Sequence, residues 1–334
     1  MADDQFIAGR RLSPAIRSAA ILVMAGLALC PGCTGSGQRS VSPVGPGAAS
    51  VTSFGAGGAP VTGRIAFSAG PAHREDIFAV DADGTALRRL TTDPAADVDP
   101  SWSPDGRRIA FCRQTGDDST AEIYVMNADG SDQRNLTRNS VADWGPAWSP
   151  DGTLIAFGSA RDGPVVYLFV MRPDGTGVRR LGQAAGEYPA WSPDGARIAF
   201  ASWGGVFRND PDFDISVIDA DGAGEKRLTD SPGTDDWPTW SIDGSRIAFA
   251  SARATDGGAP GSDRHLYIMN SDGTGQTRLS DTYAEFAAWS PDGGYIVFSP
   301  GLHLVAADGS FIGRVPVPRV EGAPEFPDWT VYAS

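Results

Sequence analysis

The stretch Trp102-Ser-Pro-Asp-Gly106, followed by Ile109-Ala-Phe111, decides the fold, because it returns along the chain. Further copies, each with an Ile-Ala-Phe or Ile-Val-Phe strand after the turn, begin at Trp148, Trp191, Trp240 and Trp289. The tryptophans of these copies lie 43 to 49 residues apart. A period of this length built from strand-like segments indicates a propeller or a solenoid.

Each repeat carries four strand signals, and four short antiparallel strands make one propeller blade. After the tryptophan strand and the Ile-Ala-Phe strand come an alternating run such as Ile123-Tyr-Val-Met126 and a fourth strand such as Asn135-Leu-Thr137. Asp-Gly pairs such as Asp129-Gly130 join the third and fourth strands. Asp-Gly between apolar runs is a strong hairpin signal, because glycine readily adopts a positive φ.

The two ends of the repeat region complement each other. Ile65-Ala-Phe67 lacks a preceding tryptophan turn, whereas Phe326-Pro-Asp-Trp329 has the tryptophan but no strands after it. We therefore expect an all-β, six-bladed β-propeller with four antiparallel strands per blade. Its ring would be closed by a C-terminal strand, about residues 326–332, that joins residues 63–92 in the first blade and removes the free sheet edges.

This set of motifs resembles the TolB-type six-bladed β-propeller, a family related to the WD-repeat class. The resemblance covers residues 63–332 and implies protein–protein recognition on one face of the propeller. Members of that family carry an α/β domain before the propeller. Residues 34–60 are too short to form one, so we expect that domain to be missing and do not carry over its contacts.

The N-terminal residues 1–33 are typical of an export signal. Three arginines precede an apolar run of 11 residues, 19–29, which is too short for a stable membrane span. The segment resembles a bacterial lipoprotein signal, which implies lipidation of Cys33, with Cys30 as the alternative. A plain cleaved secretory signal is a third interpretation.

Residues 34–60 are rich in Gly, Ser, Pro and Ala and cannot bury enough apolar surface to fold. They predict a flexible tether before the propeller domain, residues 61–334. The chain is therefore expected to be exported and anchored in a membrane by its lipid, facing the periplasm or the cell exterior.

Loop lengths distinguish the two propeller faces. The Ser-Pro-Asp-Gly and Asp-Gly turns are constant on one face, whereas loops on the other face vary, and insertions collect on the binding face. The crossings between blades on the variable face combine an acid, often an aromatic residue, and usually a proline. We expect a ring of carboxylates and aromatic side chains at the channel mouth, made by Asp97, Asp99, Asp143, Trp144, Glu187, Tyr188, Asp235, Asp236, Trp237, Glu285, Phe286, Glu325 and Phe326.

This ring has two interpretations. In the first, it attracts a basic peptide segment, an arginine-rich partner or a cation, and its aromatic residues supply contact area. In the second, each acid accepts hydrogen bonds from its own crossing and each aromatic residue packs between blades. The net charge of −14 disfavours a nucleic-acid partner. We expect a monomer that binds an envelope protein or peptide.

Signatures of catalysis are missing from the sequence. No Gly-x-Ser-x-Gly motif occurs, and the three histidines and Cys112 show no metal-ligand spacing. We predict no catalytic residue, no metal ligand and no cofactor, although Asp210-Pro-Asp212-Phe-Asp214 is a weak candidate for bound calcium. The leading hypothesis is a non-catalytic binding propeller. The alternatives are a propeller hydrolase or lyase acting on a sugar or lactone, and a carbohydrate-binding or sensing lipoprotein.

Overall fold

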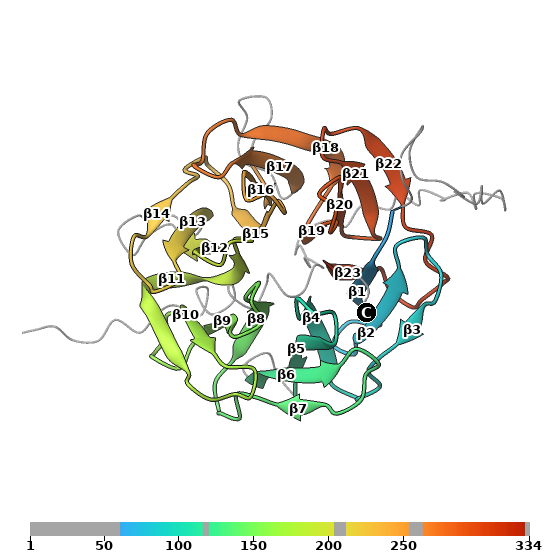
Figure 1. Cartoon of the computed structure of the whole chain (residues 1–334), viewed down its shortest axis with the longest axis horizontal. Coiled ribbons are helices and arrows are strands. Elements are labelled where there is room, and N and C mark those ends of the chain that lie inside the picture. Colours follow the sequence, from blue (N-terminus) through green and yellow to red (C-terminus); the bar gives the residue numbers. More distant parts are fainter. Residues whose placement is uncertain (1–60, 116–119, 204–211, 254–262, 331–334) are drawn as a thin grey trace, which may run out of the picture. The chain divides into compact units, whose positions relative to one another are not determined.

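The computed structural model describes residues 61–115, 120–203, 212–253 and 263–330, which all belong to one compact unit, Ser50–Ser334. These residues form antiparallel β-sheets arranged around a central axis (Figure 1). Within the described ranges, no helix is long and apolar enough to cross a membrane. The predicted export signal, both candidate lipidation sites (Cys30 and Cys33) and the tether lie outside the described residues.

Four of the sheets have four strands each. The first contains β23 (Glu325–Thr330), β1 (Arg64–Ala69), β2 (Asp76–Asp81) and β3 (Arg88–Arg89). The second contains β4 (Ala96–Trp102), β5 (Arg108–Gln114), β6 (Ala121–Asn127) and β7 (Arg134–Asn135). The third contains β15 (Asp235–Trp240), β16 (Arg246–Ser251), β17 (His265–Asn270) and β18 (Thr277–Tyr283). The fourth contains β19 (Ala287–Trp289), β20 (Tyr295–Phe298), β21 (His303–Ala306) and β22 (Phe311–Arg314).

The remaining sheet has seven strands, where the sequence predicted two separate blades. It contains β8 (Asp143–Trp148), β9 (Ile155–Ser159), β10 (Tyr167–Met171), β11 (Arg179–Trp191), β12 (Arg197–Trp203), β13 (Phe213–Asp219) and β14 (Lys226–Arg227). The 13-residue β11 pairs with β10 through its first half and with β12 through its second half. The predicted count of six separate four-stranded blades therefore differs from the observed sheets.

One residue position differs in the repeat of β11 from three of the other repeats. In the repeat of β6 and β7, the Oγ1 atom of Thr137 accepts the backbone N–H of Ile123 at 3.0 Å, and β7 has only two residues. Thr91 and Thr229 make the same bond in their repeats, and β3 and β14 are equally short. Gly182 takes this position in the repeat of β11 and has no hydroxyl group. This bond is therefore not available there, and the chain runs on as β11.

The core lies between neighbouring sheets. One buried cluster unites Ile123 of β6 with Trp148 and Phe157 of the seven-stranded sheet. Another unites Trp329 of β23 with Leu304 of β21, so the first and fourth sheets pack together. Strand β23 also pairs with β1, with Ile65 opposite Trp329. These contacts explain why the strands carry apolar residues on both faces.

The constant turns lie at one end of the sheets, which we call the turn face. Arg108, which follows the turn between β4 and β5, pairs with Asn127, which precedes the turn between β6 and β7. In the first of these turns, Ser103 Oγ donates to Asp105 Oδ1 at 2.6 Å and accepts the Arg108 N–H at 2.9 Å. The crossings between sheets lie at the other end, which we call the crossing face.

Candidate functional site

The strands nearest the axis in Figure 1 carry the residues that line two hollows, one at each end of the axis. The narrow mouth, on the crossing face, has a volume of about 120 Å³, and the wide hollow, on the turn face, about 340 Å³. Both hollows are lined by the same belt of residues, which separates them: Pro100, Pro146, Pro189, Pro238, Ala287 and Pro327. The residue immediately before each belt residue lines the narrow mouth.

The backbone before the belt is bulged. The pairing of β4 with β5 shifts register between Val98 and Ser101, and the corresponding pairings of β8, β11 and β15 shift at equivalent places. A bulge inserts one extra residue and redirects its side chain. The pairing of β23 with β1 also shifts register, between Ala66 and Ser68. We call the five residues at these positions with a positive φ the bulge residues: Asp99 (53°), Gly145 (60°), Tyr188 (52°), Trp237 (49°) and Phe326 (49°).

Four of these bulge residues are strained. A left-handed backbone costs a residue with a Cβ atom roughly 1–2 kcal/mol, and it is unusual for bulky side chains. Gly145 shows that glycine is compatible with the same backbone in the same fold. The side chains of Asp99, Tyr188, Trp237 and Phe326 are therefore retained although the backbone alone favours glycine.

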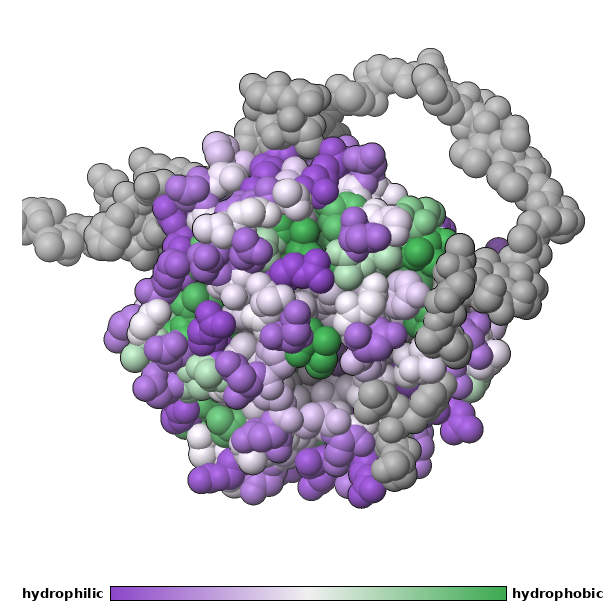
Figure 2. Space-filling model, turned by 45° about the horizontal axis from the view of Figure 1, so that its top comes forward, coloured by the Kyte–Doolittle hydropathy of each residue, from purple (hydrophilic) through white to green (hydrophobic). Residues whose placement is uncertain are grey.

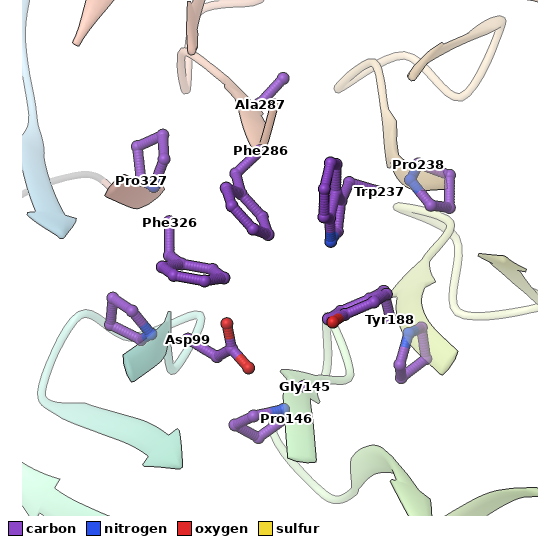
Figure 3. A pocket seen from close by; sticks show the side chains of 12 residues that line it. Asp99, Gly145, Pro146, Tyr188, Trp237, Pro238, Phe286, Ala287, Phe326 and Pro327 are labelled. Atoms are coloured by element: carbon purple, nitrogen blue, oxygen red, sulfur yellow. The ribbon is translucent and has the colours of Figure 1, made fainter. Parts of the chain in front are cut away.

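The aromatic side chains of the narrow mouth contact one another in sequence around the axis. Ring centroids are 5.7 Å apart for Tyr188 and Trp237, 4.1 Å for Trp237 and Phe286, and 3.6 Å for Phe286 and Phe326. Figure 3 shows these four side chains standing around one space, with the carboxyl group of Asp99 pointing into it. These four aromatic residues belong to the ring that the sequence predicts, and they line the narrow mouth.

Asp99 is the polar group of this space. The residue is 7% exposed, and its Oδ2 atom has no hydrogen-bond partner. Burial raises the pKa of Asp99 to about 7, while a hydrogen bond from the backbone of Gly145 opposes the shift. At neutral pH this carboxyl group is therefore close to its midpoint, and a nearby cation would favour its ionised form.

A second set of carboxyl groups lies just behind the mouth. Burial raises the pKa of Glu187 to about 7 and that of Asp236 to about 8. Burial, with the nearby carboxylate of Glu285, also raises the pKa of Glu325 to about 7. These residues do not line the mouth, so they shape its electrostatic potential from the second layer.

Three carboxylates of the expected ring do not line the narrow mouth. Asp97, Asp143 and Asp235 are all 0% exposed. Each is held by an arginine at the end of the neighbouring strand or just after it: Arg113 contacts Asp97 at 2.6 and 2.8 Å, Arg161 contacts Asp143 at 2.9 Å, and Arg253 contacts Asp235 at 2.8 Å. Burying an unpaired carboxylate is costly, and the arginines offset this cost by pairing with the three acids.

Two further side chains have roles that the sequence did not indicate. Trp144 does not line the mouth, and its Nε1 atom donates to Glu187 Oε2 at 3.1 Å. Arg264, which precedes β17, lies 3.3 Å from Asp236 and 3.7 Å from Glu285. Its guanidinium group also lies 5.0 Å from the centroid of Trp237. No repeat marks Arg264, because it follows a loop of variable length.

The wide hollow on the turn face is lined by the repeat tryptophans and by polar side chains. Asp328 Oδ2 accepts the backbone N–H of Trp102 at 2.6 Å, and burial raises the pKa of Asp328 to about 6. The indole N–H groups of Trp191 and Trp240 donate to backbone carbonyls of the preceding inner strand, both at 3.1 Å. These contacts hold neighbouring inner strands together.

The weak calcium candidate and Cys112 receive structural explanations within the described residues. Asp214 pairs with Arg227 at 3.1 Å, Asp212 accepts the backbone N–H of Gly233, and Asp210 lies outside the described ranges. No group of three or more acids, histidines or cysteines in the described ranges is placed to hold a metal ion. Cys112 is fully buried, and burial raises its pKa well above the ordinary value.

Antiparallel sheets around an axis, with a hollow at each end, define the β-propeller class. The family model of the TolB beta propeller domain matches residues 112–201 and 183–303 of this sequence. The chain belongs to the TolB beta propeller domain family.

Curated relatives carry the name Tol-Pal system protein TolB. Those from Anaeromyxobacter dehalogenans strain 2CP-C and Anaeromyxobacter sp. strain K are each 46% identical to this chain over 39 residues. The match spans 12% of this chain and 9% of either relative, so it covers a small part of their length.

Solved structures share the fold. TolB from Acinetobacter baumannii has a TM-score of 0.65 and 23% identity, over 81% of this chain and 67% of that one. A putative TolB from Agrobacterium tumefaciens has a TM-score of 0.60 and 21% identity, over 80% and 92%. A chain of a nidogen/laminin complex scores 0.64 with 14% identity, over 81% and 98%. Propellers of very different sequence therefore share this architecture.

Proposed function

We propose that this chain is an exported, non-catalytic propeller that binds a protein or peptide at the narrow mouth. The bulge residues carry the proposal. Tyr188, Trp237 and Phe326 have left-handed backbone conformations, and at the equivalent position of another repeat the residue is Gly145. Strain of this kind clusters at binding and catalytic sites, where the side chain matters more than the local backbone energy.

The charge around the mouth favours a partner with a basic segment. Asp99 lines the mouth, and Glu187, Asp236 and Glu325 lie behind it. The whole chain has a net charge of −14, which attracts cationic partners at a distance. On the face shown in Figure 2, hydrophobic residues form separate groups among hydrophilic ones. Recognition would therefore centre on the mouth rather than on a broad apolar surface.

The proposal includes a closed ring of six blades. The split pairing of β11, which belongs to two successive repeats, supports counting the seven-stranded sheet as two blades. The pairing of β23 with β1 supports closure by the C-terminal strand. Removing residues 325–334 should abolish cooperative thermal unfolding. An unchanged melting curve for that truncation would contradict the closed ring.

Attachment to a membrane is part of the same proposal and rests on the sequence of residues 1–60. Lipidation at Cys33 would anchor the propeller to a membrane, facing the periplasm or the cell exterior. Metabolic labelling with a fatty acid tests it in wild-type protein and in the Cys33→Ser and Cys30→Ser variants. Label that survives in Cys33→Ser and disappears in Cys30→Ser would move the anchor to Cys30, and no label at all would refute it.

Partner capture tests the binding function. The double variant Tyr188→Gly/Phe326→Gly removes two mouth side chains. It places glycine at both positions, as in the equivalent bulge at Gly145. Ile242→Ser, at an exposed position in a turn on the opposite face, is the matched control. We expect envelope proteins crosslinked to the wild type and to Ile242→Ser to be lost from the double variant. The same captured set for all three would refute binding at the mouth.

A further inference from the structure

The narrow mouth combines an aromatic enclosure with one unpaired carboxyl oxygen. Trp237 and Phe286 are 5% and 9% exposed, and Tyr188 and Phe326 are half-buried. The Oδ2 atom of Asp99, in a residue that is 93% buried, points into the space that these rings surround (Figure 3). A buried carboxyl oxygen without a partner is costly unless something compensates it.

Aromatic rings around an anionic group are suited to an organic cation. The face of an aromatic ring is negatively polarised and attracts cations, with tryptophan the strongest of the three side chains. The ionisable groups behind the rings are the acids Glu187, Asp236, Glu285 and Glu325, together with Arg264, which is already paired with Asp236 and Glu285. The surroundings of the mouth therefore favour a positive charge.

The hydrogen-bonding capacity of the mouth narrows the kind of cation. Among the described residues that line it, only Asp99 and Tyr188 have side chains with acceptor atoms, and the others are proline, alanine, glycine, phenylalanine or tryptophan. A guanidinium group brings five N–H donors and a primary ammonium group three, and each unpaired buried donor costs free energy. A quaternary ammonium group has no N–H donor and presents only methyl or methylene groups to the rings.

We propose that the narrow mouth binds a single quaternary ammonium group, enclosed by Tyr188, Trp237, Phe286 and Phe326 and paired with Asp99. This proposal rests on the mouth being the binding site and specifies what enters it. The group would be carried either by a small free molecule or by a trimethylated lysine of a partner. Both sources present the same chemistry to the rings.

Calorimetric titration of the full-length chain tests the proposal. The probes are choline and its uncharged carbon analogue, 3,3-dimethylbutan-1-ol, at matched ionic strength. We expect choline to bind at least tenfold more tightly than the analogue. We also expect Asp99→Asn to weaken choline binding at least tenfold, and Ile242→Ser to leave it unchanged. Equal binding of the two probes, or no binding of choline at millimolar concentration, would overturn the proposal.

A second variant guards against misfolding of Asp99→Asn. Tyr188→Gly removes one ring and places glycine in the bulge, as at Gly145, so the variant should fold. Its affinity for choline should be at least fivefold lower than that of the wild type. Unchanged choline affinity in a folded Tyr188→Gly protein would contradict the enclosure.

Peptides distinguish the two sources. A short peptide with trimethyllysine that binds more tightly than choline, and more tightly than its unmodified lysine form, would identify a modified partner. Equal or weaker binding than choline would identify a free small molecule. Tighter binding of an arginine form would overturn the quaternary class. If the wild-type protein does not bind choline but still captures its protein partners, this inference is refuted and the proposed function stands.

Discussion

The two ends of the channel treat the repeat in opposite ways. On the turn face, each Ser-x-Asp-Gly turn forms the same bonds, such as Ser192 Oγ to Asp194 Oδ1 at 2.5 Å and Ser241 Oγ to Asp243 Oδ1 at 2.6 Å. At the narrow mouth, equivalent bulges keep nearly the same φ but carry Asp, Gly, Tyr, Trp and Phe. Identical geometry comes with identical residues at one end and with different residues at the other.

This difference separates side chains that build the fold from side chains that the fold displays. A turn serine is required by the hydrogen bonds of its own turn. A mouth aromatic residue is not required by its own backbone, because Gly145 adopts the same bulge without strain. Substitutions on the turn face should therefore lower the stability of the protein, whereas substitutions at the mouth should weaken binding.

The largest expected contrast lies within β23. Trp329 is 7% exposed and donates to the Thr62 carbonyl at 3.1 Å, so Trp329→Ala should lower the unfolding free energy by about 3–5 kcal/mol. Phe326→Gly, three residues earlier, should change it by no more than about 1 kcal/mol, because relief of backbone strain offsets the lost packing. Urea unfolding measures both. Comparable losses would erase the contrast.

A turn serine should have an intermediate effect. Ser103→Ala removes the bonds to Asp105 and to the backbone of Arg108, which should cost about 1–2 kcal/mol. Ligand and partner binding should stay at the wild-type level. A Ser103→Ala protein with normal stability and impaired binding would reverse the assignment of the two ends.

Introducing a side chain at the glycine bulge tests the strain itself. Gly145 has a φ of 60°, and an added Cβ atom would lie 3.3 Å from Tyr188 Cδ1. Gly145→Ala should therefore destabilise the protein by about 1 kcal/mol, as for other L residues forced into this region. Differential scanning calorimetry checks it. A gain in stability would show that the bulge does not disfavour side chains.

The carboxyl groups in and behind the mouth predict a pH dependence of stability. Burial raises the pKa of Asp99 and Glu187 to about 7 and that of Asp236 to about 8, against about 4 in an unfolded chain. The folded chain therefore binds more protons between these values, and stability should rise as pH falls from 8 toward 5. The melting temperature should increase by a few degrees over this range.

Glu187→Gln is the control for that pH dependence. Glutamine keeps an oxygen that can accept the Trp144 indole N–H, but it does not titrate. The variant should show a shallower rise in melting temperature between pH 8 and pH 5. An identical slope would assign the pH dependence to the net negative charge of the whole chain instead.

The sequence predicted much of this arrangement because the repeat is read directly from its turns. The tryptophan turns indicated the sheets, and the acid–aromatic–proline crossings indicated the mouth. The continuity of β11 was not predicted, although the replacement of threonine by Gly182 was a visible signal. The buried pairs of Asp97, Asp143 and Asp235 were also missed, because their arginines lie in or just after a different strand and the sequence does not show which acids they contact.

One measurement tests the central claim most directly: the unfolding free energy of the Tyr188→Gly/Phe326→Gly double variant. If the mouth side chains are displayed for recognition, glycine at these left-handed positions should leave that free energy within about 1–2 kcal/mol of the wild type, since each substitution relieves roughly 1–2 kcal/mol of strain. A loss as large as that expected for Trp329→Ala would show that these side chains are part of the core and would contradict the account.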